Sequence, residues 1–126
     1  MDKRKASRSV CVVVKLKTYF VESNYSIGKG GYGKFTISSG DEVKLSYPLL
    51  CSKDEMECAI IINACGFHNR VYKQEECIIS TNSKFIADLV LTNKLPPEGL
   101  LSFVHFIRCL IKNKKLSLRL EQKVLS

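Results

Sequence analysis

Residues 28–34 have the glycine spacing of a phosphate-binding loop. Their sequence, G-K-G-G-Y-G-K, matches G-x-G-x-x-G in full and most of G-x-x-x-x-G-K. Both patterns depend on backbone N–H groups at the start of a helix, which bind phosphate. A Walker loop also needs a Ser or Thr after the lysine to hold Mg²⁺, but here Phe35 follows Lys34. The segment that follows alternates between polar and apolar residues like a strand, so the helix is missing too.

The same segment resembles the glycine loop of protein kinases, which joins two strands. The rest of a kinase is absent, because the sequence contains neither an H-R-D nor a D-F-G motif. We therefore predict that residues 28–33 form a glycine-rich turn between strands, with no nucleotide and no other cofactor bound.

Cysteine and histidine supply one weak metal pattern, formed by Cys58, Cys65, His68 and Cys77. Structural zinc sites usually contain a C-x₂-C pair, and this chain has none. We expect the thiols to be reduced and mostly buried, and we predict no metal site. No histidine is marked as the base of a nucleophile, so we predict no catalytic residues and no enzymatic activity.

The chain has 126 residues and a formal net charge of +8, which favours anionic partners. We predict a basic flexible tail over residues 1–8 and a single domain over residues 9–126. The tail fits a nuclear localisation signal, a nucleic-acid contact or a solvated terminus equally well. The candidate contacts for a protein or nucleic-acid partner are Lys3, Arg4, Lys5, Arg8, Lys29, Tyr32, Lys34, Lys112, Lys114 and Lys115.

Strand-like patterns dominate the rest of the chain. Alternation or short apolar runs predict strands at residues 10–20, 32–38, 42–47, 58–62, 71–72, 77–80, 84–92 and 116–120. Residues 100–112 fit either a C-terminal helix or the first arm of a terminal hairpin, and their strand-forming side chains favour the hairpin. About seven or eight short strands predict an all-β or mainly β protein, an antiparallel sandwich or barrel.

The apolar run at residues 9–21, followed by the glycine turn and further short strands, resembles the telokin-like proteins of nucleopolyhedroviruses. This resemblance implies a small β-barrel without enzymatic activity, acting as a viral accessory or structural protein. The predicted function is protein–protein interaction or self-association into a homo-oligomer; the alternative is a basic β-barrel that binds nucleic acid. No secretory signal or membrane span is recognised, so we expect an intracellular protein, cytoplasmic or nuclear, in the host cell if it is viral.

Overall fold

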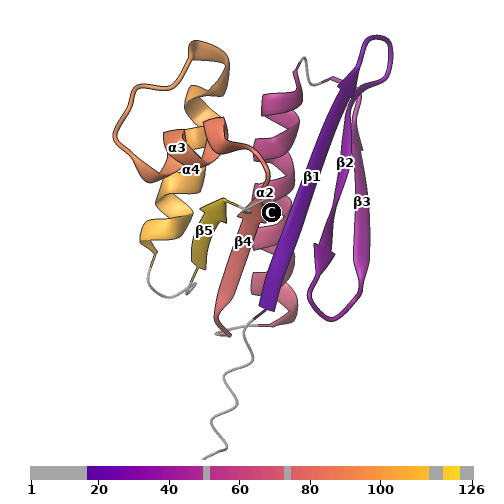
Figure 1. Cartoon of the computed structure of the whole chain (residues 1–126), viewed down its shortest axis with the longest axis vertical. Coiled ribbons are helices and arrows are strands. Elements are labelled where there is room, and N and C mark those ends of the chain that lie inside the picture. The colour runs from indigo at the N-terminus through magenta and orange to yellow at the C-terminus, as the bar shows by residue number, and fades with distance from the viewer. Residues whose placement is uncertain (1–16, 50–51, 73–74, 114–117, 123–126) are drawn as a thin grey trace, which may run out of the picture.

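The computed structural model describes residues 17–49, 52–72, 75–113 and 118–122. These residues form a mixed α/β fold (Figure 1). Along the chain, its elements are β1 (Lys17–Ser26), β2 (Gly30–Ile37), β3 (Glu42–Tyr47), α2 (Lys53–Val71), β4 (Cys77–Thr81), α3 (Lys84–Leu91), the 3₁₀ turn η1 (Glu98–Leu100), α4 (Leu101–Lys112) and β5 (Leu118–Gln122). The predicted antiparallel sandwich or barrel is therefore wrong.

The strands form one five-stranded sheet in the order β3-β2-β1-β4-β5. The first three strands are an antiparallel meander, whereas β4 runs parallel to β1 and β5 runs parallel to β4. Parallel neighbours need a crossover connection, and the helices provide it. The prediction failed here, because it placed strands where α2 and α3 lie and favoured a hairpin over the helix at residues 100–112.

A glycine-containing turn between strands is confirmed, but it is shorter than the predicted residues 28–33, because Gly30 to Gly33 already belong to β2. Residues 27–29 join β1 to β2, and the Lys29 N–H donates to the Ser26 carbonyl at 3.1 Å. Gly28 and Gly30 have φ of +91° and +77°, a region that favours glycine. The strands predicted at residues 32–38 and 42–47 correspond to β2 and β3, which pair as a hairpin with Gly40 in its turn.

Helix α2 replaces the strand predicted at residues 58–62. Ser52 caps the helix by accepting a hydrogen bond from the Glu55 N–H at 3.1 Å. The Ser-x-x-Glu spacing is that of a capping box, a signal of a helix start. Helix α2 packs against β1, β2, β4 and α4, so it is covered on several sides. Its sequence therefore contains a continuous apolar run at residues 58–62. That run was mistaken for a buried strand.

Helices α3 and α4 replace two further predicted strands. The strand predicted at 84–92 required Phe85 and Leu91 to face the core, but both are exposed. The buried residues of α3 instead follow helical spacing: Ile86, Ala87, Leu89 and Val90. In α4, Val104 and Ile107 are buried three residues apart, so the helical reading of residues 100–112 was right and the favoured hairpin was wrong.

The core lies between the sheet and α2, which crosses behind β1 and β4 in Figure 1. Tyr19 and Phe35 bring aromatic rings from β1 and β2 to within 5.8 Å between centroids. All five residues of β4 are buried, as expected of a central strand. Within the described residues, no helix is long and apolar enough to cross a membrane.

Gly33 in β2 allows a close approach of β1 and α2. A Cβ at Gly33 would collide with the Glu22 carbonyl oxygen and lie 2.5 Å from Ile60 Cδ1. We expect Gly33→Ala to lower the free energy of unfolding by about 3 kcal/mol, because neither neighbour can move freely. Urea unfolding followed by circular dichroism measures the effect.

The matched control is Gly66→Ala in the middle of α2. Its Cβ would meet only Arg70 Nη1 at 3.5 Å, an ordinary contact. Alanine is the better helix former, so this variant should gain about 1 kcal/mol. Equal effects of the two substitutions would contradict the close approach at Gly33.

Candidate functional site

The candidate site lies at the end of the sheet where β4 stops beside the parallel strand β1. Thr81, the last residue of β4, pairs with Val21, and β1 continues past this point through Ser23 to its end at Ser26. The chain beyond Thr81 turns directly into α3, whose N-cap is Ser83. In open α/β sheets, ligands bind beyond the carboxyl ends of the strands.

Glu57 from α2 reaches into this edge and is almost fully buried, with 3% of its surface exposed. The Ser23 hydroxyl donates a hydrogen bond to Glu57 Oε1, and the Thr81 hydroxyl donates one to Glu57 Oε2. Thr81 Oγ1 in turn accepts from the Ser83 N–H at 3.0 Å. We call Ser23, Glu57 and Thr81 the Glu57 cluster.

Burial raises the pKa of the Glu57 carboxyl above its ordinary value, because the charged form loses water. The hydroxyls of Ser23 and Thr81 oppose this effect by stabilising the carboxylate, and Lys53 opposes it more weakly. Nearby Asp54 adds a small upward contribution. Since burial dominates, the cluster favours a protonated carboxyl more than a surface glutamate would.

A polar cavity of about 300 Å³ opens at the Glu57 cluster. Both acidic and basic groups line it, and Lys53 is exposed at its rim. Its lining residues are Glu22, Ser23, Asn24, Lys53, Asp54, Glu57, Asn82 and Ser83.

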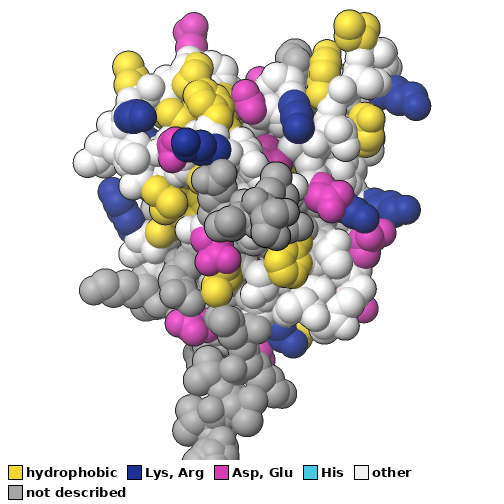
Figure 2. Space-filling view, viewed as in Figure 1, with side chains coloured by type: hydrophobic (Ala, Val, Ile, Leu, Met, Phe, Trp, Pro, Cys, Tyr) yellow, Lys and Arg dark blue, Asp and Glu magenta, His cyan; other side chains and the backbone are white. Residues whose placement is uncertain are grey.

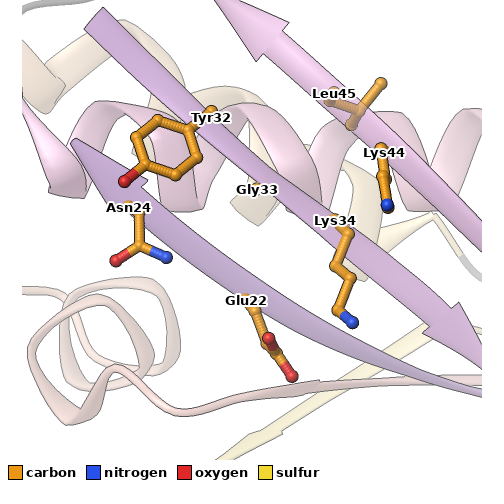
Figure 3. Close-up of a pocket in the computed structure, with 7 residues that line it drawn as sticks. All are labelled: Glu22, Asn24, Tyr32, Gly33, Lys34, Lys44 and Leu45. Carbon is orange, nitrogen blue, oxygen red and sulfur yellow. The ribbon is translucent and has the colours of Figure 1, made fainter. Parts of the chain in front are cut away.

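A second hollow of about 360 Å³ lies on the open face of the meander (Figure 3). Strand pairing sets Tyr32 opposite Asn24 and Lys34 opposite both Glu22 and Lys44. Gly33 lies between Tyr32 and Lys34 on β2 and also lines the hollow. Because Glu22 and Asn24 line both hollows, the open sheet face and the Glu57 cavity meet at these two residues.

The structure brings together only part of the predicted contact set. Tyr32 and Lys34 line the sheet-face hollow, and Lys34 donates to Glu42 at 2.7 Å. Lys29 is exposed in the β1–β2 turn, while Lys112 ends α4 at the opposite end of the sheet from the tip of β4 (Figure 1). Lys3, Arg4, Lys5, Arg8, Lys114 and Lys115 lie outside the described residues.

The weak cysteine–histidine pattern has a structural explanation. The Tyr19 hydroxyl and His68 Nδ1 form a hydrogen bond of 2.8 Å. His68 Nε2 lies 2.9 Å from the Glu75 carbonyl oxygen. With Nε2–H donating and Nδ1 accepting, the neutral ring is satisfied on both sides. Three thiols are buried, and burial raises their pKa to about 12: Cys58, Cys65 and Cys77. They remain protonated packing groups at neutral pH.

The sequence reasoning missed every member of the Glu57 cluster. Glu57 stands beside the apolar stretch that was read as a strand, and a carboxylate there is rarely buried without partners. A second signal was the polar run at residues 80–83, which follows the apolar start of β4. Together these could have indicated a polar site at a strand end, once α2 was recognised as a helix.

The basic excess does not lie in the described fold. The described residues carry equal numbers of acidic and basic side chains, so the whole net charge of +8 belongs to residues 1–16, 73–74, 114–117 and 123–126. On the face shown in Figure 2, Lys and Arg side chains are scattered among acidic ones rather than gathered into a patch.

The sheet order and the parallel pairing of β1 with β4 define a mixed α/β protein. Comparison with solved structures shows that its fold is similar to that of ribonuclease H1. Two solved structures carry this assignment. One is LC11-RNase H1 in complex with an RNA/DNA hybrid: TM-score 0.68, 14% identity, covering 85% of this chain and 84% of that one. The other is LC11-RNase H1 isolated from compost by a metagenomic approach: TM-score 0.68, 12% identity, covering 85% and 83%.

No family model and no curated protein matches the sequence. At such low identity, the likeness to the two structures shows the fold alone. It nevertheless overturns the predicted non-enzymatic β-barrel or sandwich, because the matching fold is that of an enzyme. The expectation that this chain is no enzyme therefore loses its basis, and neither a viral origin nor self-association finds support. The β-barrel implied by the telokin-like resemblance is wrong as well.

Nuclease sites can use two divalent cations, which stabilise the attacking and leaving oxygens. Mg²⁺ binds through carboxylates and keeps several waters. The Glu57 cluster does not fit this group, because it offers a single carboxylate, and its other two members are neutral hydroxyls that donate to that carboxylate. Among the described residues, no group of three or more His, Cys, Asp or Glu side chains could hold a metal ion.

Proposed function

We propose that this protein binds nucleic acid, with an RNA/DNA hybrid duplex as the ligand to test first. The observation that carries the proposal is the fold shared with LC11-RNase H1, whose structure was solved with such a hybrid, over 85% of this chain. The net charge of +8 supports the same class of ligand, because phosphate contacts supply most of the affinity for nucleic acids.

Two features support an interface on the edge and open face around Glu22 and Asn24. The cavity and the sheet-face hollow meet there, and Lys44 and Lys53 are exposed beside them. Tyr32 is 40% exposed in the hollow, so its ring is available to stack on a sugar or base. Hydrolysis is no part of the proposal, because the Glu57 cluster does not fit a divalent cation.

Fluorescence anisotropy with a labelled RNA/DNA hybrid tests the proposal, with duplex DNA and duplex RNA of the same sequence as competitors. We expect the hybrid to bind, and its affinity to fall linearly on a log–log plot against salt concentration. Resolving the same samples on a denaturing gel shows whether either strand is cut. Absence of binding to all three duplexes at low salt would contradict the proposal.

Substitutions at Lys44 and Lys53 test where the interface lies. Lys44→Glu with Lys53→Glu should weaken hybrid binding on the order of tenfold, because each reversal removes a positive charge and adds a negative one beside the hollows. The matched control is Arg70→Glu with Lys112→Glu, which changes the net charge equally. Arg70 lies in the last turn of α2 and Lys112 in the last turn of α4, and neither lines the two hollows. The control variant should therefore lose less affinity for the hybrid.

A further inference from the structure

The Glu57 cluster ties three elements together through a single carboxyl group. Ser23 extends from β1, Thr81 ends β4, and Glu57 lies in the second turn of α2. All three side chains are buried. We infer that the hydroxyls of Ser23 and Thr81 keep the Glu57 carboxyl from binding divalent cations. Hydrogen bonds, and not a metal ion, then hold this edge of the sheet together.

The hydrogen bonds that Glu57 accepts are the first support for this inference. Each carboxylate oxygen of Glu57 accepts a hydrogen bond from a hydroxyl on a different strand. Each oxygen keeps a second lone pair, but a cation bound there would meet one carboxylate and two hydroxyls in a buried site. That ligand set carries too little negative charge to replace the water that Mg²⁺ gives up. A hydroxyl is also a weaker ligand for Mg²⁺ than the carboxylate that an aspartate would place at the same position.

The charges around the cavity support it as well. Lys53 lines the same cavity, so a positive charge already lies near the carboxyl. The acidic residues of the lining do not complete a site, because Glu22 is exposed to solvent and only Asp54 adjoins the cluster on α2. Burial, which favours the protonated carboxyl, opposes cation binding further.

The inference predicts that two substitutions would open the site. Ser23→Asp with Thr81→Asp would put three carboxylates where one now lies between two hydroxyls. Three buried carboxylates repel one another unless a cation is present, so the variant should depend on Mg²⁺ or Mn²⁺ for stability. The inference is independent of nucleic-acid binding, and its failure leaves the proposed function untouched.

The first experiment uses the wild-type protein. Mn²⁺ is titrated into ¹⁵N-labelled protein, and line broadening is measured at the backbone amides of Ser23, Glu57 and Thr81. We expect these amides to broaden no more than those of α4, and the melting temperature to be unchanged by millimolar Mg²⁺. Selective broadening around the cluster, or a rise in melting temperature with Mg²⁺ that Glu57→Gln abolishes, would overturn the inference.

The second experiment uses the double aspartate variant. We expect selective Mn²⁺ broadening at the cluster and a melting temperature several degrees higher with Mg²⁺ than with a chelator. If circular dichroism shows that the double variant is unfolded without metal, recovery of the fold on adding Mg²⁺ supports the inference equally. The inference is overturned if the double variant binds no cation, whether folded or unfolded, and Ser23→Asp alone binds none either. The hydroxyls of Ser23 and Thr81 would then not be what excludes the metal.

Discussion

Replacing Lys3, Arg4 and Lys5 together by alanine should weaken binding of an RNA/DNA hybrid on the order of tenfold to a hundredfold at low salt. The reason is the distribution of charge. The described fold is electrically balanced, so the excess positive charge that attracts phosphate lies in segments such as residues 1–16. Anisotropy titrations at several salt concentrations measure both the affinity and its salt dependence.

The salt dependence separates a direct phosphate contact from an indirect effect. Each lost contact should reduce the slope of log affinity against log salt by about 0.9. The matched control is alanine at Arg70, Lys94 and Lys112, which removes the same charge from the described fold. If both triple variants lose the same affinity and slope, the N-terminal segment has no special part in binding and only net charge matters.

Glu57→Ala should lower the free energy of unfolding by about 3 kcal/mol, one of the largest effects expected of a single substitution here. The change leaves the hydroxyls of Ser23 and Thr81 without their acceptor in a buried site. It also leaves a space where the side chain packed. The midpoint of urea unfolding, followed by circular dichroism, measures the loss.

Glu57→Gln is the control, because its amide keeps one acceptor and provides a donor to which the second hydroxyl can turn. It should lose much less stability than Glu57→Ala at neutral pH. The two variants would be equally unstable only if the Glu57 cluster contributed nothing through its hydrogen bonds.

Comparison of the wild-type protein with Glu57→Gln shows how the stability provided by the Glu57 cluster responds to pH. The folded-state pKa of Glu57 is raised, so the stability that its protonated form provides is present at low pH and is lost as pH rises through that folded-state pKa. Wild-type protein should therefore lose stability relative to Glu57→Gln as pH rises above the ordinary glutamate pKa. Unfolding free energies of both proteins across this range test the sign, and a difference that does not change with pH would contradict it.

The sequence predicted β2, β3 and residues 17–20 of β1, because the signals of the antiparallel half of the sheet are local. Alternation in β1 to β3 and glycines at Gly28, Gly30 and Gly40 are sufficient to set two hairpins. The parallel half failed for the opposite reason. Its strands pair across long stretches of chain, and α2 is buried on enough sides to lose the polar face by which a helix is recognised.

The site was missed along with the parallel half. Ser23 and Thr81 are ordinary residues in the sequence, and only the pairing of β1 with β4 brings them to the same carboxylate. Capping signals at Ser52 and Ser83 were available and would have placed α2 and α3 correctly. Even so, the partners of Glu57 follow from topology and not from any local motif.

The position of β1 in the sheet bears on how the chain folds. β1 pairs with its sequence neighbour β2 on one side and with the distant β4 on the other. The meander can form early, since its contacts are local, but the second ladder must wait until α2 has formed and returned the chain to the sheet. Until then, one edge of β1 is an unpaired template for another chain. The protein is therefore most prone to aggregate during folding, after the first hairpins have formed and before β4 has paired with β1.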